Sequence, residues 1–376
     1  MKQFLLKTTL FCLPLLVLFS IPMVLLYTSG EGFRGIDTLI ESRQKYLIGY
    51  AYSEVNYRYL KKKEIQIRPA QSVIAVGSSR ILQFREAMLK DSFYNAGYTI
   101  TKITEVKPFI ASNLQKKKPD VLLLALDQWM FNENYDAAKE LNPTDHRWEA
   151  DFTSKIPTRT YLNVWSDLLD SKYSISDVFA GDNSTCVGLN ALINGQGFRK
   201  DGSMNYGDQV KKLLRKDSTA NDYGFADTYS RIETGGSLFE FGHEVNPQAI
   251  RALDDLLSYC KREKIYVVAF LPPYAQAVYE KMKLSGKYTY IDGIYPAAKQ
   301  VFEKYNFELW DFTELHRFNS NDTEMIDGFH GSEVTYLKML LYMLENGSVL
   351  QEKTDVIQLR RDLSRKTNRY QIYNSF

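Results

Sequence analysis

The first residues in the chain that could do chemistry are two serines in the segment Val76-Gly77-Ser78-Ser79-Arg80. This segment follows a short apolar run, SVIAV, which is typical of a buried strand. A serine at the turn after a strand can project its hydroxyl above the edge of the sheet, and its own N–H can help to bind an oxyanion. Taken alone, Gly-Ser-Ser is weak evidence for catalysis, because most such turns are only turns.

The second chemical feature is the segment Asp327-Gly328-Phe329-His330, directly before a predicted helix. An Asp and a His three residues apart on one loop can act as an orienting carboxylate and a general base for a serine hydroxyl. A helix-capping turn that carries a surface histidine is the alternative explanation. Only 4 histidines occur in the chain, and this one lies where a parallel sheet would present it.

The remaining histidines, His146, His243 and His316, lie in unrelated contexts without metal-ligand spacing. Gly235-Gly236 is not followed by the Lys-Ser/Thr of a phosphate-binding loop. We therefore expect no metal and no cofactor. The net charge of +2 gives no indication of nucleic-acid binding.

The elements that must position these residues alternate between short apolar runs and helical patterns. Such a sequence predicts an α/β fold with a parallel sheet covered by helices on both faces, and with ligand sites at the carboxyl ends of the strands. The predicted strands cover residues 72–76, 121–126, 266–271 and 307–312. The predicted helices cover residues 81–90, 103–118, 246–263, 294–305 and 331–344.

Residues 131–244 do not follow this rhythm and are rich in Asn, Asp, Ser, Gly and Tyr. Their length exceeds that of an ordinary loop, so we interpret them as an insertion or cap within a domain that covers residues 70–345. Residues 346–376 form a polar and basic C-terminal tail. A solvated helix explains this tail, and contact with an anionic membrane surface or a partner is the alternative.

The N-terminus predicts a membrane anchor over residues 1–28. From Thr8 to Thr28 the chain has no charged residue, and about 20 apolar residues suffice to span a bilayer as a helix. Lys2 and Lys7 precede the run and Glu31 follows it, which places the N-terminus in the cytoplasm and the main domain outside. A cleaved signal peptide is the alternative, but the run is long and no small-x-small site follows it.

Residues 29–69 connect this anchor to the domain and are interpreted as a juxtamembrane helix or linker. Helical periodicity covers residues 36–63 within this segment. Two cysteines follow the anchor, Cys186 and Cys260, and an oxidising compartment would permit a disulfide between them. Cys260 also fits the apolar face of an amphipathic helix, where a buried thiol is an equally good explanation.

Together the two chemical segments resemble the SGNH hydrolases, also called the GDSL family, over residues 72–344. Gly77-Ser78-Ser79 looks like the first block of that family, which implies that Ser79 is the nucleophile. The segment FYNAG, residues 93–97, looks like the second block and implies that Gly97 donates an N–H to the oxyanion. Asp327 and His330 match the last block. The resemblance implies a three-layer α/β/α domain.

The third block departs from the family pattern. After the strand VLLLAL the family has Gly-x-Asn-Asp, whereas this chain has Asp127-Gln128-Trp129. Gln128 could donate an amide N–H in place of the Asn, but Asp127 as a carboxylate would repel an oxyanion. Arg80 follows the nucleophile and could bind an anionic group. An outward salt bridge is the alternative role for Arg80.

These departures, with a single N-terminal anchor, are similar to one branch of the family that includes the teichoic-acid D-alanylation protein and the alginate acetylation proteins. Members of that branch act beside a polytopic membrane-bound O-acyltransferase. The resemblance therefore implies serine-dependent transfer of an acyl group, such as acetyl, to a glycan or polyol polymer of the bacterial cell envelope. An O-acetyl esterase of the same fold, and an inactive SGNH-like domain that binds polymer or acts as a scaffold, are the alternatives.

Overall fold

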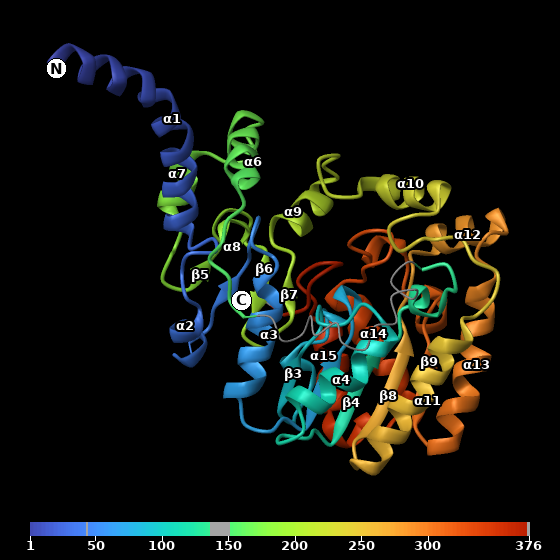
Figure 1. Cartoon of the computed structure of the whole chain (residues 1–376). Helices are drawn as coiled ribbons and strands as arrows, with labels where there is room; N and C mark the ends of the chain where they lie inside the picture. Colours follow the sequence, from blue (N-terminus) through green and yellow to red (C-terminus); the bar gives the residue numbers. More distant parts are fainter. Residues whose placement is uncertain (43, 136–150, 374–376) are drawn as a thin grey trace.

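A computed structural model describes residues 1–42, 44–135 and 151–373. The chain forms a mixed α/β body with one long N-terminal helix that extends away from it (Figure 1). The body contains a five-stranded parallel sheet and a smaller four-stranded sheet that lies between this sheet and the N-terminal helix.

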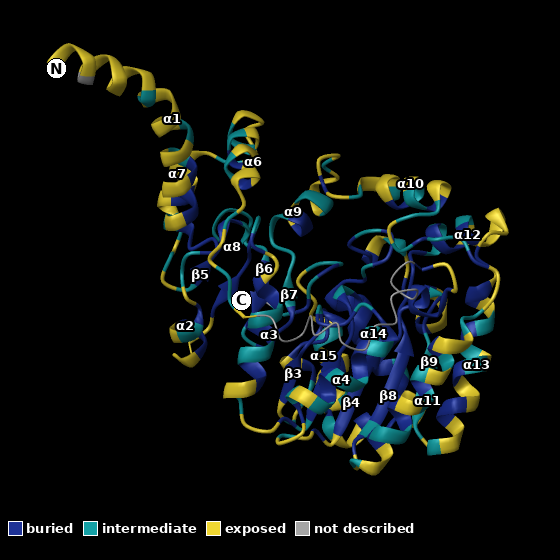
Figure 2. Ribbon diagram, in the orientation of Figure 1, coloured by how far each residue is buried: buried dark blue, intermediate teal, exposed yellow. Residues whose placement is uncertain are grey.

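The five-stranded sheet has the order β3-β2-β4-β8-β9, and all of its neighbouring strands are parallel. Its central strands are apolar and fully buried, as a parallel sheet covered on both faces requires (Figure 2). The predicted strands are therefore found with small changes at their ends. The strand bounds are β2 Val73–Val76, β3 Phe93–Asn95, β4 Val121–Ala125, β8 Tyr266–Leu271 and β9 Glu308–Asp311.

Helices surround this sheet, and three of them, α4, α11 and α13, pack side by side. Their bounds, and those of the other helices around the sheet, are α4 Ile103–Asn113, α11 Pro247–Arg262, α12 Gln276–Ser285, α13 Tyr290–Tyr305, α14 Glu333–Glu345 and α15 Val356–Ser364. Helix α11 begins where the sequence predicts, because Asn246 accepts the N–H of Gln248 at 2.8 Å and Pro247 occupies the first turn. Single turns of 3₁₀-helix occur at η1 Ser79–Ile81, η2 Glu86–Met88, η3 Gln128–Phe131, η5 Tyr223–Phe225, η6 Leu315–Phe318, η7 Asp322–Glu324 and η8 Val349–Lys353.

The helix predicted over residues 81–90 is wrong. The chain there makes the short turns η1 and η2 instead of a continuous helix. The reason lies in Asn95, whose side-chain amide donates to the carbonyls of Ile81 at 2.9 Å and Phe84 at 3.0 Å. The carbonyls of Ile81 and Phe84 therefore accept hydrogen bonds from Asn95 at the end of β3. These bonds hold the segment in short turns in place of a helix.

The smaller sheet joins segments that are far apart in the sequence. Strand β1 from the predicted linker pairs with β5 in parallel and with β6 in antiparallel orientation, and β6 pairs with β7. The strand bounds are β1 Leu47–Ile48, β5 Cys186–Val187, β6 Gly197–Arg199 and β7 Met204–Asn205. The linker and the insertion thus fold together, with a shared apolar cluster that includes Tyr50, Tyr57 and Phe198.

The single helix predicted over residues 36–63 is consequently wrong. The segment forms α2 Asp37–Glu41, then β1, then α3 Asn56–Ile67. Gly49, directly after β1, lies against the backbone of the insertion. A Cβ at Gly49 would lie 1.8 Å from the carbonyl oxygen of Gln196, so the two backbones pass too closely for any other residue.

A buried lysine joins the two sheets. Lys61 of α3 is fully buried, and its ammonium donates to the carbonyl of Asn95 at 2.8 Å and to the carbonyl of Gly202. The N–H of Asn95 donates to the carbonyl of Asp201 at 2.8 Å. The turn between β6 and β7 is therefore fixed to the carboxyl end of β3.

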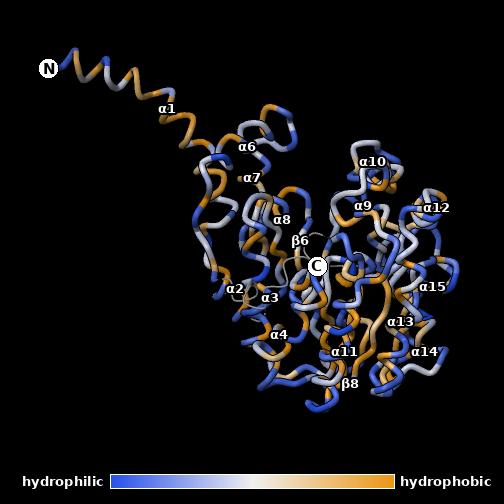
Figure 3. The backbone as a smooth tube through the Cα atoms, turned by 45° about the vertical axis from the view of Figure 1, so that its right-hand side comes forward, coloured by the Kyte–Doolittle hydropathy of each residue, from blue (hydrophilic) through white to orange (hydrophobic). Residues whose placement is uncertain are grey.

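The N-terminal helix α1, Lys2–Ser29, is long and apolar enough to cross a membrane, and it is apolar along almost its whole length (Figure 3). Its N-terminal half is exposed and extends from the body, and Gly30 in the left-handed conformation ends it. The C-terminal half packs against helices of the insertion. The helices in contact with α1 are α6 Thr158–Leu169, α7 Ile175–Ala180 and α8 Leu189–Asn194, and the insertion also contains α9 Asp208–Arg215 and α10 Ala226–Thr234.

The cysteines are not paired. Cys186 lies in the small sheet and Cys260 lies in α11, and both are buried free thiols. The disulfide considered from the sequence is therefore absent from the described residues. Burial raises the pKa of Cys260 to about 12, which keeps this thiol protonated and unreactive at neutral pH.

Candidate active site

Ser79, His330 and Asp327 form one hydrogen-bonded chain. The hydroxyl oxygen of Ser79 lies 2.7 Å from Nε2 of His330, and Nδ1 of His330 lies 2.7 Å from Oδ2 of Asp327. All three residues retain some solvent exposure, with the side chains of His330 and Asp327 exposed by 15% and 18%. Hydroxyl, imidazole and carboxylate in this order have the geometry of a nucleophile, a general base and an orienting acid.

Strand β2 positions Ser79. The strand ends at Val76, and a Cβ on the next residue, Gly77, would lie only 2.8 Å from the Cβ of Ala125 on β4, so the turn can pass this close to β4 only with glycine. Ser78 then caps the η1 turn by accepting the N–H of Arg80 at 3.1 Å. The hydroxyl of Ser79 is thereby placed at the carboxyl-terminal edge of the five-stranded sheet, as the sequence predicts.

A tight loop positions His330. Asp327 Oδ1 accepts the N–H of Phe329 at 2.9 Å and the N–H of His330 at 2.7 Å, and the N–H of Ile326 donates to the carbonyl of His330 at 2.8 Å. Burial alone would raise the pKa of Asp327, but the charge of His330 and these hydrogen bonds lower it below the ordinary value. Asp327 is thus held as a carboxylate that fixes both the loop and the imidazole.

The insertion contacts this histidine loop directly. Asp222 Oδ2 accepts the N–H of Gly328 at 2.9 Å and also accepts the hydroxyl proton of Thr228 at 2.6 Å. The ring of Phe329 packs edge-to-face on Phe239, with centroids 5.6 Å apart. The sequence predicts an insertion or cap over residues 131–244 but does not connect it to this loop.

Arg80 does not point outward, so the surface salt bridge considered for it is wrong. Its side chain is fully buried, with Nη1 3.4 Å from Asp127 Oδ1 and 2.7 Å from Gln128 Oε1. The guanidinium also donates to three backbone carbonyls, of Phe329 at 2.9 Å, of Pro272 at 3.0 Å and of Pro273 at 2.6 Å. Arg80 therefore joins three loops below the site and has no free donor face for an anionic substrate.

Asp127 is fully buried beside this arginine. Burial raises the pKa of Asp127 to about 6, although the positive charge of Arg80 lowers it in part. The Oδ2 atom of Asp127 has no hydrogen-bond partner among the described residues. The carboxyl group thus compensates part of the charge of Arg80.

Two of the predicted oxyanion donors have other acceptors. The amide of Gln128 donates to the carbonyl of Pro272 at 2.8 Å and lies 3.2 Å from the hydroxyl of Thr313, in the protein interior. The N–H of Gly97 donates to Asn95 Oδ1 at 2.9 Å. Neither group is free in this structure, whereas the N–H of Ser79 donates to no other described residue.

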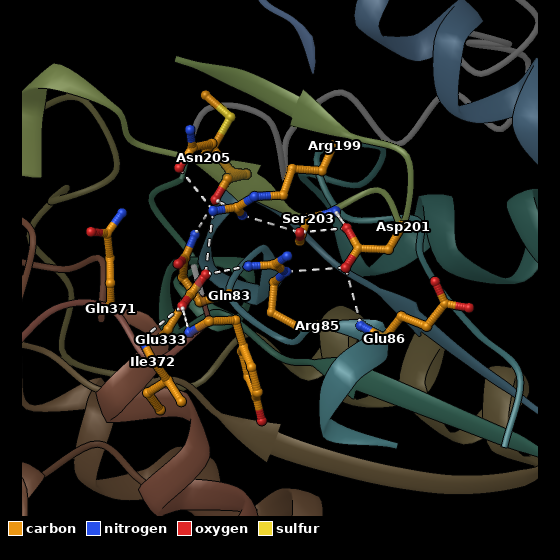
Figure 4. Close-up of polar contacts among 12 residues, drawn as sticks. Gln83, Arg85, Glu86, Arg199, Asp201, Ser203, Asn205, Glu333, Gln371 and Ile372 are labelled. Atoms are coloured by element: carbon orange, nitrogen blue, oxygen red, sulfur yellow. Dashed lines mark hydrogen bonds and ion pairs between the residues drawn. The ribbon is translucent and has the colours of Figure 1, made fainter. Parts of the chain in front are cut away.

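A buried ionic cluster lies beside the histidine loop, and Figure 4 shows its contacts. Glu333, the first residue of α14, accepts from Arg85 at 2.5 Å and from Arg199 at 3.3 Å. Arg85 also contacts Asp201 at 3.1 Å. The second oxygen of Glu333 accepts the N–H of Ile372 at 3.0 Å. The cluster therefore joins the small sheet, the C-terminal segment and the helix that follows His330.

Of the other histidines, the two that the structure describes, His243 and His316, are not part of this site. His243 lies near Thr289 at the surface, His316 lies 3.7 Å from Glu314, and His146 is outside the described residues. Within residues 1–42, 44–135 and 151–373, no three His, Cys, Asp or Glu side chains are placed to hold a metal ion.

Comparison with known proteins gives no further identification. No protein-family model matches the chain, and no match is found among curated proteins or solved structures.

Proposed function

We propose that this chain is an extracytoplasmic serine-dependent O-acyltransferase with an SGNH-type, three-layer α/β/α core. The observation that carries the proposal is the hydrogen-bonded chain from Ser79 through His330 to Asp327. A parallel sheet supports it, because two segments that are about 250 residues apart in sequence meet at the carboxyl-terminal edge of that sheet.

In the first half-reaction, His330 Nε2 takes the hydroxyl proton of Ser79 while the Ser79 oxygen attacks the carbonyl carbon of an acyl ester. The tetrahedral intermediate collapses, the bond to the donor alcohol breaks, and His330 returns the proton to that alcohol. The acyl group remains as an ester on Ser79. Asp327 holds the imidazole in the tautomer that these proton transfers require.

In the second half-reaction, an acceptor hydroxyl loses its proton to His330 and attacks the acyl-enzyme, which regenerates the Ser79 hydroxyl. A sugar or polyol acceptor makes the protein a transferase, and water makes it an esterase. The N–H of Ser79 can bind the oxyanion in both steps. A second donor would require the N–H of Gly97 or the amide of Gln128 to leave its acceptor when the substrate binds.

The location proposed for this chemistry follows from helix α1. Lys2 and Lys7 precede its uncharged stretch, so the charge distribution favours a cytoplasmic N-terminus and a site on the outer side of the membrane. Envelope glycans and polyols are the hydroxyl-rich polymers available there. A polytopic membrane-bound O-acyltransferase is the proposed source of the acyl group, on the strength of the family resemblance.

Product analysis tests the transferase against its alternatives. Full-length protein in detergent is incubated with p-nitrophenyl acetate, with and without an excess of a polyol or an oligosaccharide acceptor, and compared with Ser79→Ala. A transferase gives acetylated acceptor at the expense of free acetate, whereas an esterase gives acetate alone. Equal rates for the wild type and Ser79→Ala would favour the inactive scaffold and contradict the proposal.

A further inference from the structure

Two helices of the insertion expose apolar side chains to solvent. We define residues 158–180, which include α6 and α7, as the membrane hairpin. Its large exposed apolar residues are Leu162, Leu169, Ile175 and Phe179, with exposed fractions of 56%, 79%, 45% and 56%. Such a group of exposed apolar residues next to another apolar element marks an interaction surface.

Helix α6 is divided into faces. Thr160 and Val164 are buried against the protein, whereas Leu162 and Leu169 are seven residues apart and share an exposed face. In α7, Ile175 and Phe179 are four residues apart and also share an exposed face, while Val178 is buried. The buried faces already account for the packing of the hairpin, so the exposed apolar faces are left for another occupant.

The hairpin lies beside the apolar helix α1 (Figures 1 and 3). The indole N–H of Trp165 donates to the carbonyl of Leu18 at 2.7 Å, and the ring of Tyr161 lies 5.7 Å from that of Phe19. Leu26 of α1 belongs to the same buried cluster as residues of both hairpin helices. The hairpin therefore follows the C-terminal half of α1.

These contacts fix the level of the hairpin relative to a bilayer. Between Lys7 and Glu31 the chain has no charged residue, and a span of about 20 residues must fall within that stretch. Any such span includes Leu18 and continues to the last turns of α1. An element packed from Leu18 onward consequently lies at the level of the leaflet on the domain side.

A buried carboxylate makes this placement rigid. Glu31, two residues after α1, is fully buried and accepts the N–H groups of Ala51 at 3.1 Å, Tyr52 at 2.7 Å, Ser53 at 2.7 Å and Leu189 at 3.0 Å. Four backbone bonds to one side chain join α1 to the small-sheet region that carries the hairpin. These bonds fix the end of α1 to the region next to the hairpin, and the contacts of Trp165 and Tyr161 hold the hairpin itself against α1.

We propose that the membrane hairpin inserts its exposed apolar faces into the domain-side leaflet of the bilayer that α1 crosses. The hairpin has two basic residues, Arg159 and Lys172, against three acidic ones, Asp167, Asp170 and Asp177. Attraction to anionic lipid therefore would not drive the hairpin to the membrane. The burial of its exposed apolar side chains would drive it there. This insertion does not depend on the chemistry at Ser79, but it rests on the membrane span of α1.

Depth-dependent fluorescence quenching tests the insertion. Full-length protein, free of any partner, is placed in nanodiscs of phosphatidylcholine and phosphatidylglycerol that contain lipids with an acyl-chain quencher. One environment-sensitive fluorophore is attached per molecule, at Leu169→Cys or Phe179→Cys in a Cys12→Ser background. The buried Cys186 and Cys260 are not expected to react, which labelling of the Cys12→Ser parent checks.

The chain offers matched controls for both environments. Leu284→Cys and Ile357→Cys place the fluorophore on apolar residues that are 88% and 72% exposed and lie outside the hairpin. A label on the native Cys12 places the fluorophore within α1, as the control for the bilayer interior. Insertion predicts that the labels at 169 and 179 are quenched at least about twofold more than those at 284 and 357, and that pure phosphatidylcholine gives the same result.

Each other outcome overturns the proposal in a distinct way. If the label at Cys12 is quenched but those at 169 and 179 behave like the water controls, α1 spans the bilayer and the hairpin does not enter it. A partner protein would then be the occupant to seek. Loss of quenching in pure phosphatidylcholine would show electrostatic attachment in place of insertion. If Cys12 is unquenched as well, the membrane span of α1 fails together with the hairpin.

Discussion

The guanidinium of Arg80, the residue after Ser79, lies beside the buried carboxyl group of Asp127, with Nη1 3.4 Å from Oδ1. Both side chains are fully buried. The chain thus places a buried ion pair directly after the candidate nucleophile Ser79. The pair supports the loops that form the site instead of binding substrate.

Replacement of Arg80 is expected to destabilise the fold. Arg80→Met leaves Asp127 and the carbonyls of Phe329 and Pro273 without this donor, and loss of one partner of a buried ion pair costs about 3–5 kcal/mol. The free energy of unfolding in urea measures this loss. Arg360→Met, which removes an exposed pair with Glu345, is the control and should change stability by less than about 1 kcal/mol. Equal small effects of both variants would contradict the role of Arg80.

The buried Asp127 is expected to make stability depend on pH. Because its pKa is raised to about 6 in the folded state, its neutral form contributes stability that is fully present below the ordinary pKa of 3.8 and lost as the pH rises through about 6. The difference corresponds to on the order of 3 kcal/mol. Between pH 4 and about 6, the wild type should therefore lose stability relative to Asp127→Asn as the pH rises. Parallel stability curves for the two proteins would show that Asp127 does not titrate in this range.

The orienting carboxylate is tested by Asp327→Asn. The Asn oxygen can still accept the N–H groups of Phe329 and His330, but its amide faces Nδ1 of the imidazole and favours the wrong tautomer. We expect kcat for ester turnover to fall on the order of 10³- to 10⁴-fold, with thermal unfolding nearly unchanged. Asp322→Asn, which keeps an acceptor for the N–H of Gln276, should leave kcat unaltered. A comparable loss in both variants would point to a structural effect.

The ionic cluster beside His330 is tested by Glu333→Ala. This change leaves the buried Arg85 and Arg199 without a shared partner, so we expect a loss of about 3–5 kcal/mol in the free energy of unfolding. Glu345→Ala, on the same helix, removes only the exposed pair with Arg360 and should cost less than about 1 kcal/mol. Chemical denaturation of the three proteins gives the comparison. A loss below about 1 kcal/mol for Glu333→Ala would show that the cluster adds no stability.

The sequence predicts β2, β4, β8 and β9 of the main sheet because their pattern is local, whereas the three-residue strand β3 is not predicted. Strands such as β4 and β8 are continuous apolar runs bounded by polar residues, and helix α11 has its cap in the adjacent Asn246. The small sheet has no comparable pattern. Its strands β1 and β5 have two residues each, and only their pairing across about 140 residues defines them. No periodicity within residues 36–63 could show that pairing.

Some residues of the candidate site can likewise be predicted from local sequence, and others cannot. Ser79, Asp327 and His330 can be found from residue type and spacing, and the structure brings their side chains together. The direction of a side chain after a turn is not encoded locally, which is why the outward position considered for Arg80 is wrong. The contacts of Asp222 and Glu333 with the region of the site could not be predicted either, because their partners lie far away in the sequence.

The most direct test of the central claim is a search for a covalent intermediate on Ser79. Full-length protein is treated with a fluorophosphonate probe, digested, and mapped by mass spectrometry, with Ser78→Ala and Ser79→Ala as matched variants. A nucleophilic Ser79 gives one adduct on Ser79 in the wild type and in Ser78→Ala, and none in Ser79→Ala. An unlabelled wild type, or the same labelling in Ser79→Ala, would contradict the central claim.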